Sequence, residues 1–262
     1  MSAPAAGGPN AGPNAEPNAA GPNAGGRAVV TGAASGIGAA IARRLTADGM
    51  DVLGIDHRAC PGIDHRVVDL GDLDRVTGLA AELDDERPTD VFVSCAGMFE
   101  GQASADLDFA TYDRTLRVNL HAPVYLMGRF AARMAGRGYG RIVAITSIHA
   151  RMSEPTALAY DVGKGGLDAA VRTVAIENAD RNVLVNAVSP GFVRTGMSIV
   201  DGEDELESAW FKDHYLATGR LPTRRAAEPD EVASAVSYLV SGGNTYVTGA
   251  SLTVDGGLSA RF

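Results

Sequence analysis

Short apolar segments alternate with helical stretches along most of the chain, and this alternation limits the fold more than any other feature. The apolar segments are four to six residues long and rich in branched side chains, as is typical of strands buried in a parallel sheet. The predicted strands are Arg27–Thr31, Asp51–Asp56, His65–Val68, Asp90–Ser94, Arg141–Thr146, Val183–Val188 and Ser251–Val254. The predicted helices are Gly36–Asp48, Leu73–Leu83, Phe109–Met134, Thr156–Asp180 and Pro229–Val240. This order predicts a single α/β domain with a doubly wound parallel sheet of about seven strands, which binds ligands at the carboxyl ends of its strands.

The connection between the second and third predicted strands is unusually short. Only about nine residues, from His57 onward, separate the two strands, whereas a parallel crossover usually needs about a dozen or more. The sequence therefore predicts a loop at this point in place of a helix.

Composition excludes several classes of protein. The net charge of −9 argues against nucleic acid or an anionic membrane as a main partner. No apolar run approaches the roughly 18–20 residues that span a bilayer, and no basic segment followed by an apolar one opens the chain. The two cysteines, Cys60 and Cys95, form neither a disulfide framework nor a cluster with metal-ligand spacing. We therefore expect a cytoplasmic protein without a bound metal.

Residues 1–26 repeat a four-residue unit of the type Gly-Pro-Asn-Ala. Gly, Pro and Asn disfavour both helix and strand, and the repeats offer nothing that a core could bury. We predict a disordered low-complexity tail over residues 1–26, with partner binding as the alternative, and an ordered domain over residues 27–262.

A glycine-rich turn, TGAASGIG, follows the first predicted strand and opens the first predicted helix. Glycines let the backbone turn tightly and approach a pyrophosphate, and the helix N-terminus offers free N–H groups and a positive dipole. A plain tight turn would have the same composition, but the strand before it and the helix after it favour a dinucleotide site. The residues expected to bind the cofactor here are Gly32, Ser35, Gly36, Ile37 and Gly38.

Asp56 ends the second predicted strand, 18 residues after Gly38. A carboxylate at this position can accept hydrogen bonds from the adenosine ribose and would repel a 2′-phosphate. No Arg or Lys lies in the glycine turn to attract that phosphate. The sequence thus favours NAD over NADP, although the Asp could also be a solvated loop residue and His57-Arg58 follows it directly.

Tyr160 and Lys164 are spaced i, i+4 near the start of a predicted helix, so their side chains lie on one face. A free phenol has a pKa of about 10, too high for an efficient base near neutral pH. A nearby ammonium group favours the phenolate and lowers that pKa. A Tyr and a Lys at this spacing are common by chance, so the surrounding residues decide whether the pair is interpreted as catalytic.

Two further polar residues accompany this pair. Ser147 lies 13 residues before Tyr160, just after the predicted strand Arg141–Thr146, where its hydroxyl could polarise a carbonyl group. Asn119 lies within the predicted helix Phe109–Met134. An amide on an apolar helix face is either a satisfied core group or part of a proton relay.

Taken together, these motifs show that residues 27–257 resemble the short-chain dehydrogenase/reductase family, whose members have a Rossmann-type fold. The resemblance rests on the glycine turn, Asp69-Leu70, Asn119, Ser147, Tyr160-x-x-x-Lys164, Pro190-Gly191 with Thr195, and the closing Val254-Asp255-Gly256-Gly257. The chain departs from the family at Ser94-Cys95-Ala96-Gly97, where the family has Asn-Asn-Ala-Gly. This change puts local contacts in doubt but not the chemistry.

The resemblance implies a role for each matching residue. Asn119, Ser147, Tyr160 and Lys164 would form a catalytic tetrad, in which Tyr160 exchanges a proton with the alcohol while a hydride passes to the nicotinamide and Asn119 helps carry the proton to water. The further cofactor contacts implied by the family pattern are Asp69, Leu70, Ser94, Ala96, Gly97, Tyr160, Lys164, Pro190, Val193 and Thr195. Family members are usually tetramers or dimers, built through the helices predicted at Phe109–Met134 and Thr156–Asp180, so a homotetramer or homodimer is expected.

The substrate is less constrained by the sequence than the cofactor. Ser147, His149 and Phe192 are the candidate contacts, and residues 196–222 are expected to form a mobile lid. His149 could bond a polar group of the substrate, act as a second acid–base, or simply be a loop histidine bonded to backbone.

We therefore predict an NAD-dependent enzyme that interconverts a secondary alcohol and a ketone on a cyclic or polar small molecule, as in secondary metabolism. One alternative is a 3-oxoacyl-carrier-protein-type reductase, which would normally use NADP and a basic docking surface. Another is a non-catalytic NAD-sensing protein, which would have no reason to keep Ser147, Tyr160 and Lys164 together.

Overall fold

A parallel sheet of seven strands forms the centre of the protein in the computed structural model, which describes residues 25–260. The strands are β1 (Arg27–Thr31), β2 (Asp51–Asp56), β3 (Asp64–Val67), β4 (Val91–Ser94), β5 (Gly140–Ile145), β6 (Val183–Pro190) and β9 (Ser251–Val254). They pair in the order β3-β2-β1-β4-β5-β6-β9, and all six pairings are parallel. The predicted single-domain, doubly wound α/β fold is confirmed.

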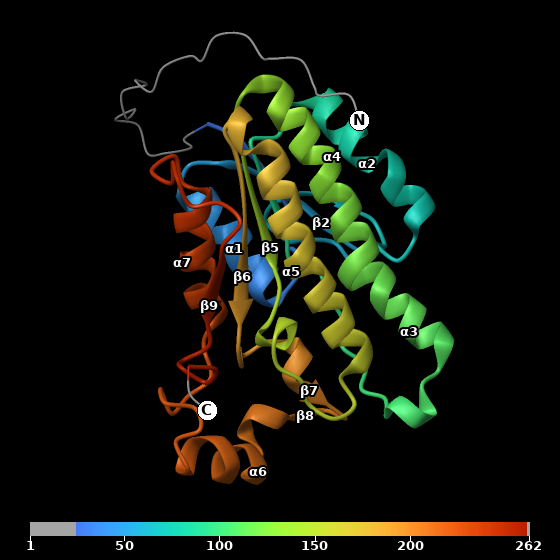
Figure 1. Ribbon diagram of the computed structural model, residues 1–262, viewed down its shortest axis with the longest axis vertical. Helices are drawn as coiled ribbons and strands as arrows, with labels where there is room; N and C mark the ends of the chain where they lie inside the picture. Colours follow the sequence, from blue (N-terminus) through green and yellow to red (C-terminus); the bar gives the residue numbers. More distant parts are fainter. Residues whose placement is uncertain (1–24, 261–262) are drawn as a thin grey trace, which may run out of the picture.

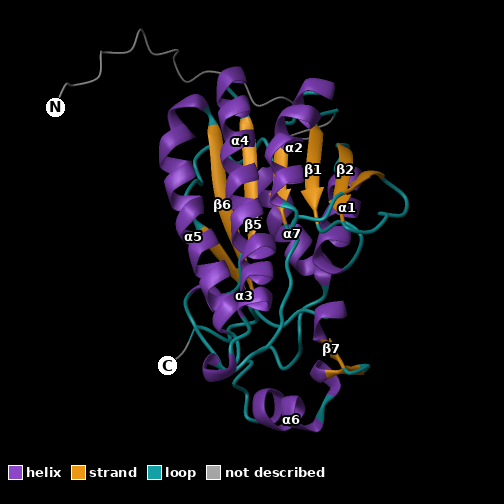
Figure 2. Cartoon of the chain, turned by 90° about the vertical axis from the view of Figure 1, so that its right-hand side faces the viewer, coloured by secondary structure: helices purple, strands orange, loops and turns teal. Residues whose placement is uncertain are grey.

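Helices cover both faces of this sheet (Figures 1 and 2). The longer helices are α1 (Gly36–Ala47), α2 (Leu73–Glu86), α3 (Phe109–Leu116), α4 (Ala122–Arg137), α5 (Leu158–Asn178) and α7 (Pro229–Val240). Two apolar clusters result: one joins the sheet to α1 and α7, and the other joins it to α2, α4 and α5. Burial on both faces explains why the strand sequences are almost continuously apolar.

No helix lies between β2 and β3, as the short connection predicts. Residues 57–63 form a loop, and Cys60 within it is 1% exposed and packs in the same apolar cluster as Ala33 and Ile63. The tail predicted over residues 1–26 lies outside the described residues except for Gly25 and Gly26.

The sheet has a topological switch point between β1 and β4. From β1 the chain proceeds to β2 and β3 on one side, and from β4 it proceeds to β5, β6 and β9 on the other. Ligands of such folds bind in the crevice at the carboxyl ends of the strands at this point. The Thr31 hydroxyl bridges the two strands here, because it accepts hydrogen bonds from the backbone N–H groups of Cys95 (3.0 Å) and Ala96 (3.1 Å).

The helix predicted over Phe109–Met134 is present, but it is not α-helical throughout. A π-helical turn, Arg117–His121, separates α3 from α4, and α4 extends to Arg137. Such turns insert an extra residue into a helix and are frequent at functional sites. Asn119 lies in the middle of this π turn and is fully buried.

Residues 196–222, expected to form a lid, contain short elements of their own. A two-stranded antiparallel ribbon, β7 (Ile199–Val200) and β8 (Glu203–Asp204), is followed by α6 (Ala209–Phe211) and a π-helical turn over Lys212–Ala217. These elements lie beyond the carboxyl ends of the sheet strands, at the bottom of Figures 1 and 2. A small apolar cluster that includes Leu206, Phe211 and Leu221 holds this segment together.

Candidate active site

Three polar side chains meet just beyond the end of β5. Ser147 follows that strand, and Tyr160 and Lys164 occupy the first two turns of α5. The Ser147 side chain hydrogen-bonds the Tyr160 phenol, and the Lys164 ammonium lies 5.5 Å from the centre of the Tyr160 ring. The ammonium also donates to the Ile145 carbonyl at 2.9 Å. The structure therefore brings together Tyr160 and Lys164, which the spacing predicted as neighbours, and Ser147, which the family resemblance grouped with them.

Asn119 holds the loop after β4 in place. Its side-chain oxygen accepts from the Met98 N–H at 2.9 Å, and its amide nitrogen donates to the Met98 carbonyl at 2.8 Å. A Cβ atom on Gly97 would lie 3.3 Å from Asn119 Oδ1 and 3.4 Å from Lys164 Nζ. Asn119 thus borders the same glycine as Lys164 and braces the loop, while its part in a proton relay stays a prediction.

Burial dominates the acid–base properties of this cluster. It raises the pKa of Tyr160 to about 12, and the hydrogen bond with Ser147 acts in the opposite direction without compensating for it. Burial also lowers the pKa of Lys164 to about 8. Desolvation thus shifts the phenol pKa in the direction opposite to the one expected from Lys164, and the tuning of Tyr160 by Lys164 stays a prediction.

The glycine turn between β1 and α1 is shaped to admit a phosphate. A Cβ atom on Gly38 would lie 2.1 Å from the Gly32 carbonyl oxygen, and Gly32 itself has a φ of +73°. The Ser35 side chain, at the N-cap of α1, makes no hydrogen bond to the first turn of that helix. The N–H groups of that turn are therefore left without a side-chain cap, as an anion site at a helix N-terminus requires. Thr195, expected at the nicotinamide end, lies beside this turn, since a Cβ on Gly36 would be 3.2 Å from Thr195 Cγ2.

Asp56 ends β2 beside the glycine turn. Its carboxylate accepts from the backbone N–H groups of Ala34 and Arg58, each at 3.1 Å, and lies 3.0 Å from His57 Nδ1. The Arg58 guanidinium donates to the Ser35 hydroxyl at 3.0 Å. A cation therefore reaches the glycine turn from the neighbouring loop, which the turn's own sequence did not indicate.

The other predicted cofactor residues lie at the same edge of the sheet. The Asp69 carboxylate pairs with Arg114 at 2.9 Å and accepts from the Gly71 N–H at 2.8 Å; the Arg114 hydrogen bond is the main reason that its pKa is lowered. Leu70 is buried in the core, and Val193 is buried where it bridges to Ala227. Ser94, Ala96, Gly97 and Pro190 follow or end strands β4 and β6.

His149 pairs with a carboxylate rather than with backbone. Its Nδ1 lies 2.6 Å from an Asp161 oxygen, and its ring packs edge-on against Tyr160 with 5.4 Å between the centroids. Phe99 contacts the same phenol ring at 5.5 Å. Sequence reasoning singled out His149 but missed Asp161, although its position directly after Tyr160 was a usable signal. Phe192 packs on Phe211 and Tyr215 of the lid, at 4.9 and 4.8 Å.

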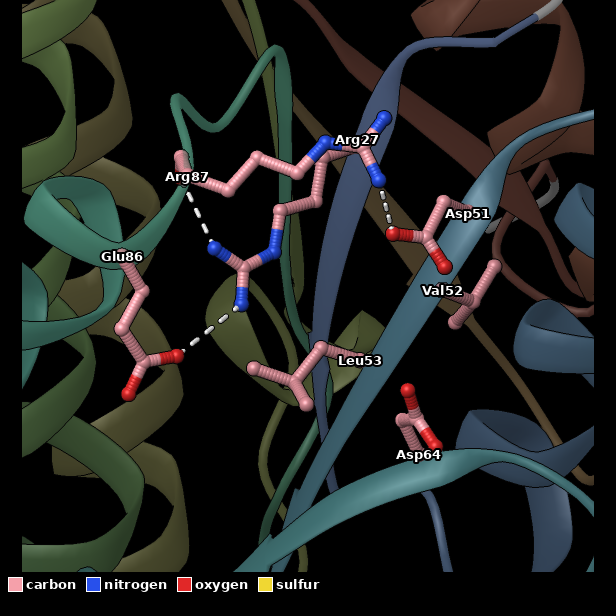
Figure 3. Close-up of a pocket in the computed structure, with 7 residues that line it drawn as sticks. All are labelled: Arg27, Asp51, Val52, Leu53, Asp64, Glu86 and Arg87. Atoms are coloured by element: carbon pink, nitrogen blue, oxygen red, sulfur yellow. Dashed lines mark hydrogen bonds and ion pairs between the residues drawn. The ribbon is translucent and has the colours of Figure 1, made fainter.

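A separate pocket lies at the opposite end of the sheet (Figure 3). Arg27, Asp51 and Asp64 line it from the first residues of β1, β2 and β3. Its charges pair with one another, as in the ion pairs Arg27–Glu86 and Arg87–Asp51. This pocket lies away from the carboxyl ends of the strands, and we assign it no part in the chemistry.

Over residues 25–260, no group of three His, Cys, Asp or Glu side chains is arranged to hold a metal ion. Within the same range, no helix combines the length and the apolar character needed to cross a membrane.

Comparison with known proteins identifies the class to which this fold and site belong. A family model described as enoyl-(acyl carrier protein) reductase matches residues 32–259. The chain is 31% identical to acetoacetyl-CoA reductase of Allochromatium vinosum (88% of this chain, 97% of that protein) and 34% identical to galactitol 2-dehydrogenase (L-tagatose-forming) of Cereibacter sphaeroides (88% and 93%). The crystal structure of an NAD(P)-dependent gluconate 5-dehydrogenase from Beutenbergia cavernae with bound NADP is similar with a TM-score of 0.82 and 33% identity, covering 91% of this chain and 98% of that one. The chain belongs to the short-chain dehydrogenase/reductase family of oxidoreductases.

Proposed function

We propose that this protein is an NAD-dependent alcohol dehydrogenase/reductase that interconverts a secondary alcohol and a ketone. The observation that carries the proposal is the meeting of Ser147, Tyr160 and Lys164 beside the glycine turn, at the switch point of the sheet. A binding protein would need the turn but not the reactive phenol.

Each side chain of the cluster has a distinct task in this proposal. Tyr160 exchanges a proton with the substrate hydroxyl, and Ser147, within hydrogen-bond reach of the same phenol, holds the oxygen that becomes the carbonyl. Lys164 supplies a positive charge 5.5 Å from the ring, which favours the phenolate when the proton leaves. Asn119 fixes the Met98 loop beside Lys164. General acid–base catalysis of this kind contributes about 10²–10⁴ in rate.

A nicotinamide cofactor would supply the acceptor or donor of the hydride when bound. Gly32, Ser35, Gly36, Ile37 and Gly38 would hold its pyrophosphate, and Asp56 would accept from the adenosine ribose. NAD is favoured because Asp56 places a carboxylate at this end. Arg58 acts against that preference, since its guanidinium reaches Ser35 and could pair with a 2′-phosphate. Comparing kcat/KM for NAD and NADP in one assay decides between the two cofactors.

The substrate class follows from the small-molecule chemistry of the relatives. Two of them are named as dehydrogenases of sugar alcohols or sugar acids and one as a reductase of an acyl-CoA. We favour a small cyclic or polar alcohol in a secondary-metabolic pathway, because the net charge of −9 disfavours docking of an acidic carrier protein. A 3-oxoacyl reductase is the alternative, supported by the acyl-CoA relative. Turnover of acetoacetyl-CoA exceeding that of all free alcohols and ketones would favour it.

We further propose a cytoplasmic homotetramer or homodimer. Exposed apolar side chains on the helices that such assemblies would use support this proposal: Phe109 on α3 is 75% exposed and Ile176 on α5 is 81% exposed. Light scattering after size exclusion measures the assembly directly.

The Tyr160→Phe variant tests the proposed chemistry. It removes the acid–base oxygen and keeps the ring between Phe99 and His149, so we expect a loss of kcat of at least about 10²-fold with cofactor affinity within twofold of wild type. Tyr246→Phe is the matched control, since Tyr246 is 94% exposed. Formation of NADH at a near-normal rate by Tyr160→Phe would refute the assignment.

A further inference from the structure

His149 and Asp161 form a side-chain pair that contacts Tyr160 and that the proposed hydride-transfer chemistry does not use. The two are joined at 2.6 Å through His149 Nδ1. Only 18% of the His149 side chain and 16% of the Asp161 side chain are exposed. The pair therefore belongs to the wall of the site and not to the outer surface.

Asp161 determines which nitrogen of His149 faces a ligand. A carboxylate only accepts hydrogen bonds, so Nδ1 must carry the proton that lies between the two groups. The other nitrogen, Nε2, lies 3.6 Å from a Glu154 carboxylate oxygen, which is too long for a direct hydrogen bond. Within the described part of the chain, Nε2 has no hydrogen-bond partner and is free to bind a substrate group.

The charges around His149 limit what that group can be. Asp161 and Glu154 both face the imidazole, so a carboxylate or phosphate at Nε2 would meet two negative charges. A hydroxyl is neutral and bonds an imidazole in either protonation state, as donor or as acceptor.

We propose that His149, oriented by Asp161, binds a second hydroxyl group of a neutral vicinal diol or polyol, on the carbon next to the one that is oxidised. This inference rests on the proposed function in one respect, namely that Tyr160 receives the first hydroxyl. The His149 and Tyr160 rings pack against each other with 5.4 Å between their centroids, so the two side chains line the same part of the site, where adjacent oxygens of one small molecule would meet them. Asp161 acts as a positioning residue, and His149 determines specificity.

Cyclohexanol and cis-1,2-cyclohexanediol form a matched pair of substrates for the test. Removing one hydrogen bond between protein and substrate in His149→Ala should lower kcat/KM for the diol about tenfold. The ratio of kcat/KM for the diol to kcat/KM for cyclohexanol should fall by the same factor, since loss of the His149 ring beside Tyr160 affects both alcohols. His65→Ala is the control, because His65 lies on the edge strand β3 and bonds the Ile63 carbonyl. An equal loss on both alcohols, or no loss on the diol, would overturn the proposal.

The Asp161→Asn variant tests the positioning role. A neutral amide holds the Nδ1–H group less strongly than a carboxylate does, so KM for the diol should rise while KM for cyclohexanol and the affinity for the cofactor stay unchanged. An unchanged KM for the diol would remove Asp161 from the proposal.

The proposed function and this inference can fail separately. Turnover of cyclohexanol that Tyr160→Phe abolishes supports the function whatever His149 does, and no turnover of any alcohol or ketone refutes it. In that second case, calorimetric binding of the diol to the cofactor-loaded protein still tests His149. The Kd should be about tenfold weaker in His149→Ala, and an equal Kd in both proteins would overturn the inference.

Discussion

Lys164 illustrates how far a single buried side chain is controlled by its surroundings. The residue is 3% exposed, and its ammonium group donates to one backbone carbonyl. This contact replaces only part of the hydration that the group loses, so burial lowers the pKa of Lys164 from 10.5 to about 8. The same burial raises the pKa of Tyr160. Both pKa shifts favour the neutral form of the side chain. Because a pKa that differs between the folded and unfolded states makes stability depend on pH, the free energy of unfolding should change with pH.

The Lys164→Met variant tests this shift through stability. Below pH 8 the folded protein keeps Lys164 charged and bears the full cost of burying it. Between pH 8 and 10.5 the folded lysine loses its proton while the unfolded one keeps it, so the wild type gains stability as the pH rises. From pH 7 to 10.5, the free energy of unfolding of the wild type should therefore rise by about 3 kcal/mol relative to that of Lys164→Met.

Denaturant unfolding at the two pH values measures this difference. Lys212→Met removes the only other lysine, which is half exposed and pairs with Glu207, and controls for loss of a surface charge. A difference between Lys164→Met and wild type that is the same at both pH values would contradict the lowered pKa.

At the scale of elements, two helical glycines differ in the space around them. One position has no room for a side chain, and the other lies open to solvent. Gly38, in the first turn of α1, faces the Gly32 carbonyl across the cofactor turn, where a Cβ would lie at 2.1 Å. Gly78 lies on the exposed side of α2, with no atom within 4 Å of a Cβ position. The same substitution should therefore have opposite effects at the two sites.

We expect Gly38→Ala to destabilise the fold by about 3 kcal/mol, because two backbone segments must separate, and to abolish cofactor binding. Gly78→Ala should stabilise the protein by about 1 kcal/mol, because alanine restricts the unfolded chain and suits a helix. Thermal unfolding and titration with NADH measure both effects. If Gly38→Ala bound NADH with wild-type affinity, the turn would not be the pyrophosphate site.

Elements with strong periodicity were predicted well from the sequence, and those that depend on remote contacts were not. Strands β1, β2 and β9 and helix α7 have the predicted ends. The π turn at Arg117–His121 was missed, because Asn119 bonds a loop 21 residues away that no local pattern reveals. The short elements of the lid were missed for the same reason, since Phe211 gains its partners from Phe192 and Leu221.

In the candidate site, too, some residues were predicted from the sequence and others depend on contacts between remote elements. The i, i+4 spacing placed Tyr160 and Lys164 together, and the family resemblance added Ser147, which follows a predicted strand. The partners of His149 and Ser35 were not predicted, because Asp161 and Arg58 reach them from separate elements. Local patterns thus identified the members of the candidate cluster, whereas the charges around them required the tertiary structure.

On the scale of the whole molecule, the two ends of the sheet have different tasks. The carboxyl ends of the strands carry the glycine turn, Tyr160 and the lid, whereas the amino ends carry the charged pocket of Figure 3. There the Arg27 guanidinium, 7% exposed, donates to the carbonyls of Leu83 at 2.7 Å and Arg87 at 2.8 Å and pairs with Glu86 at 3.6 Å. Arg27 therefore ties the start of β1 to the end of α2, at the end of the sheet away from the cofactor turn.

Changes at this end should affect stability and leave the chemistry intact. Arg27→Met leaves two carbonyls that have lost a donor and should lower the free energy of unfolding by about 2–4 kcal/mol. Arg66→Met removes another partner of Glu86, but that pair is 41% exposed on both sides, so its loss should cost less than about 1 kcal/mol. At a temperature where each variant is folded, kcat/KM should stay within twofold of wild type, as initial rates of NADH formation would show. A large fall in kcat/KM for folded Arg27→Met would mean that the two ends of the sheet are coupled.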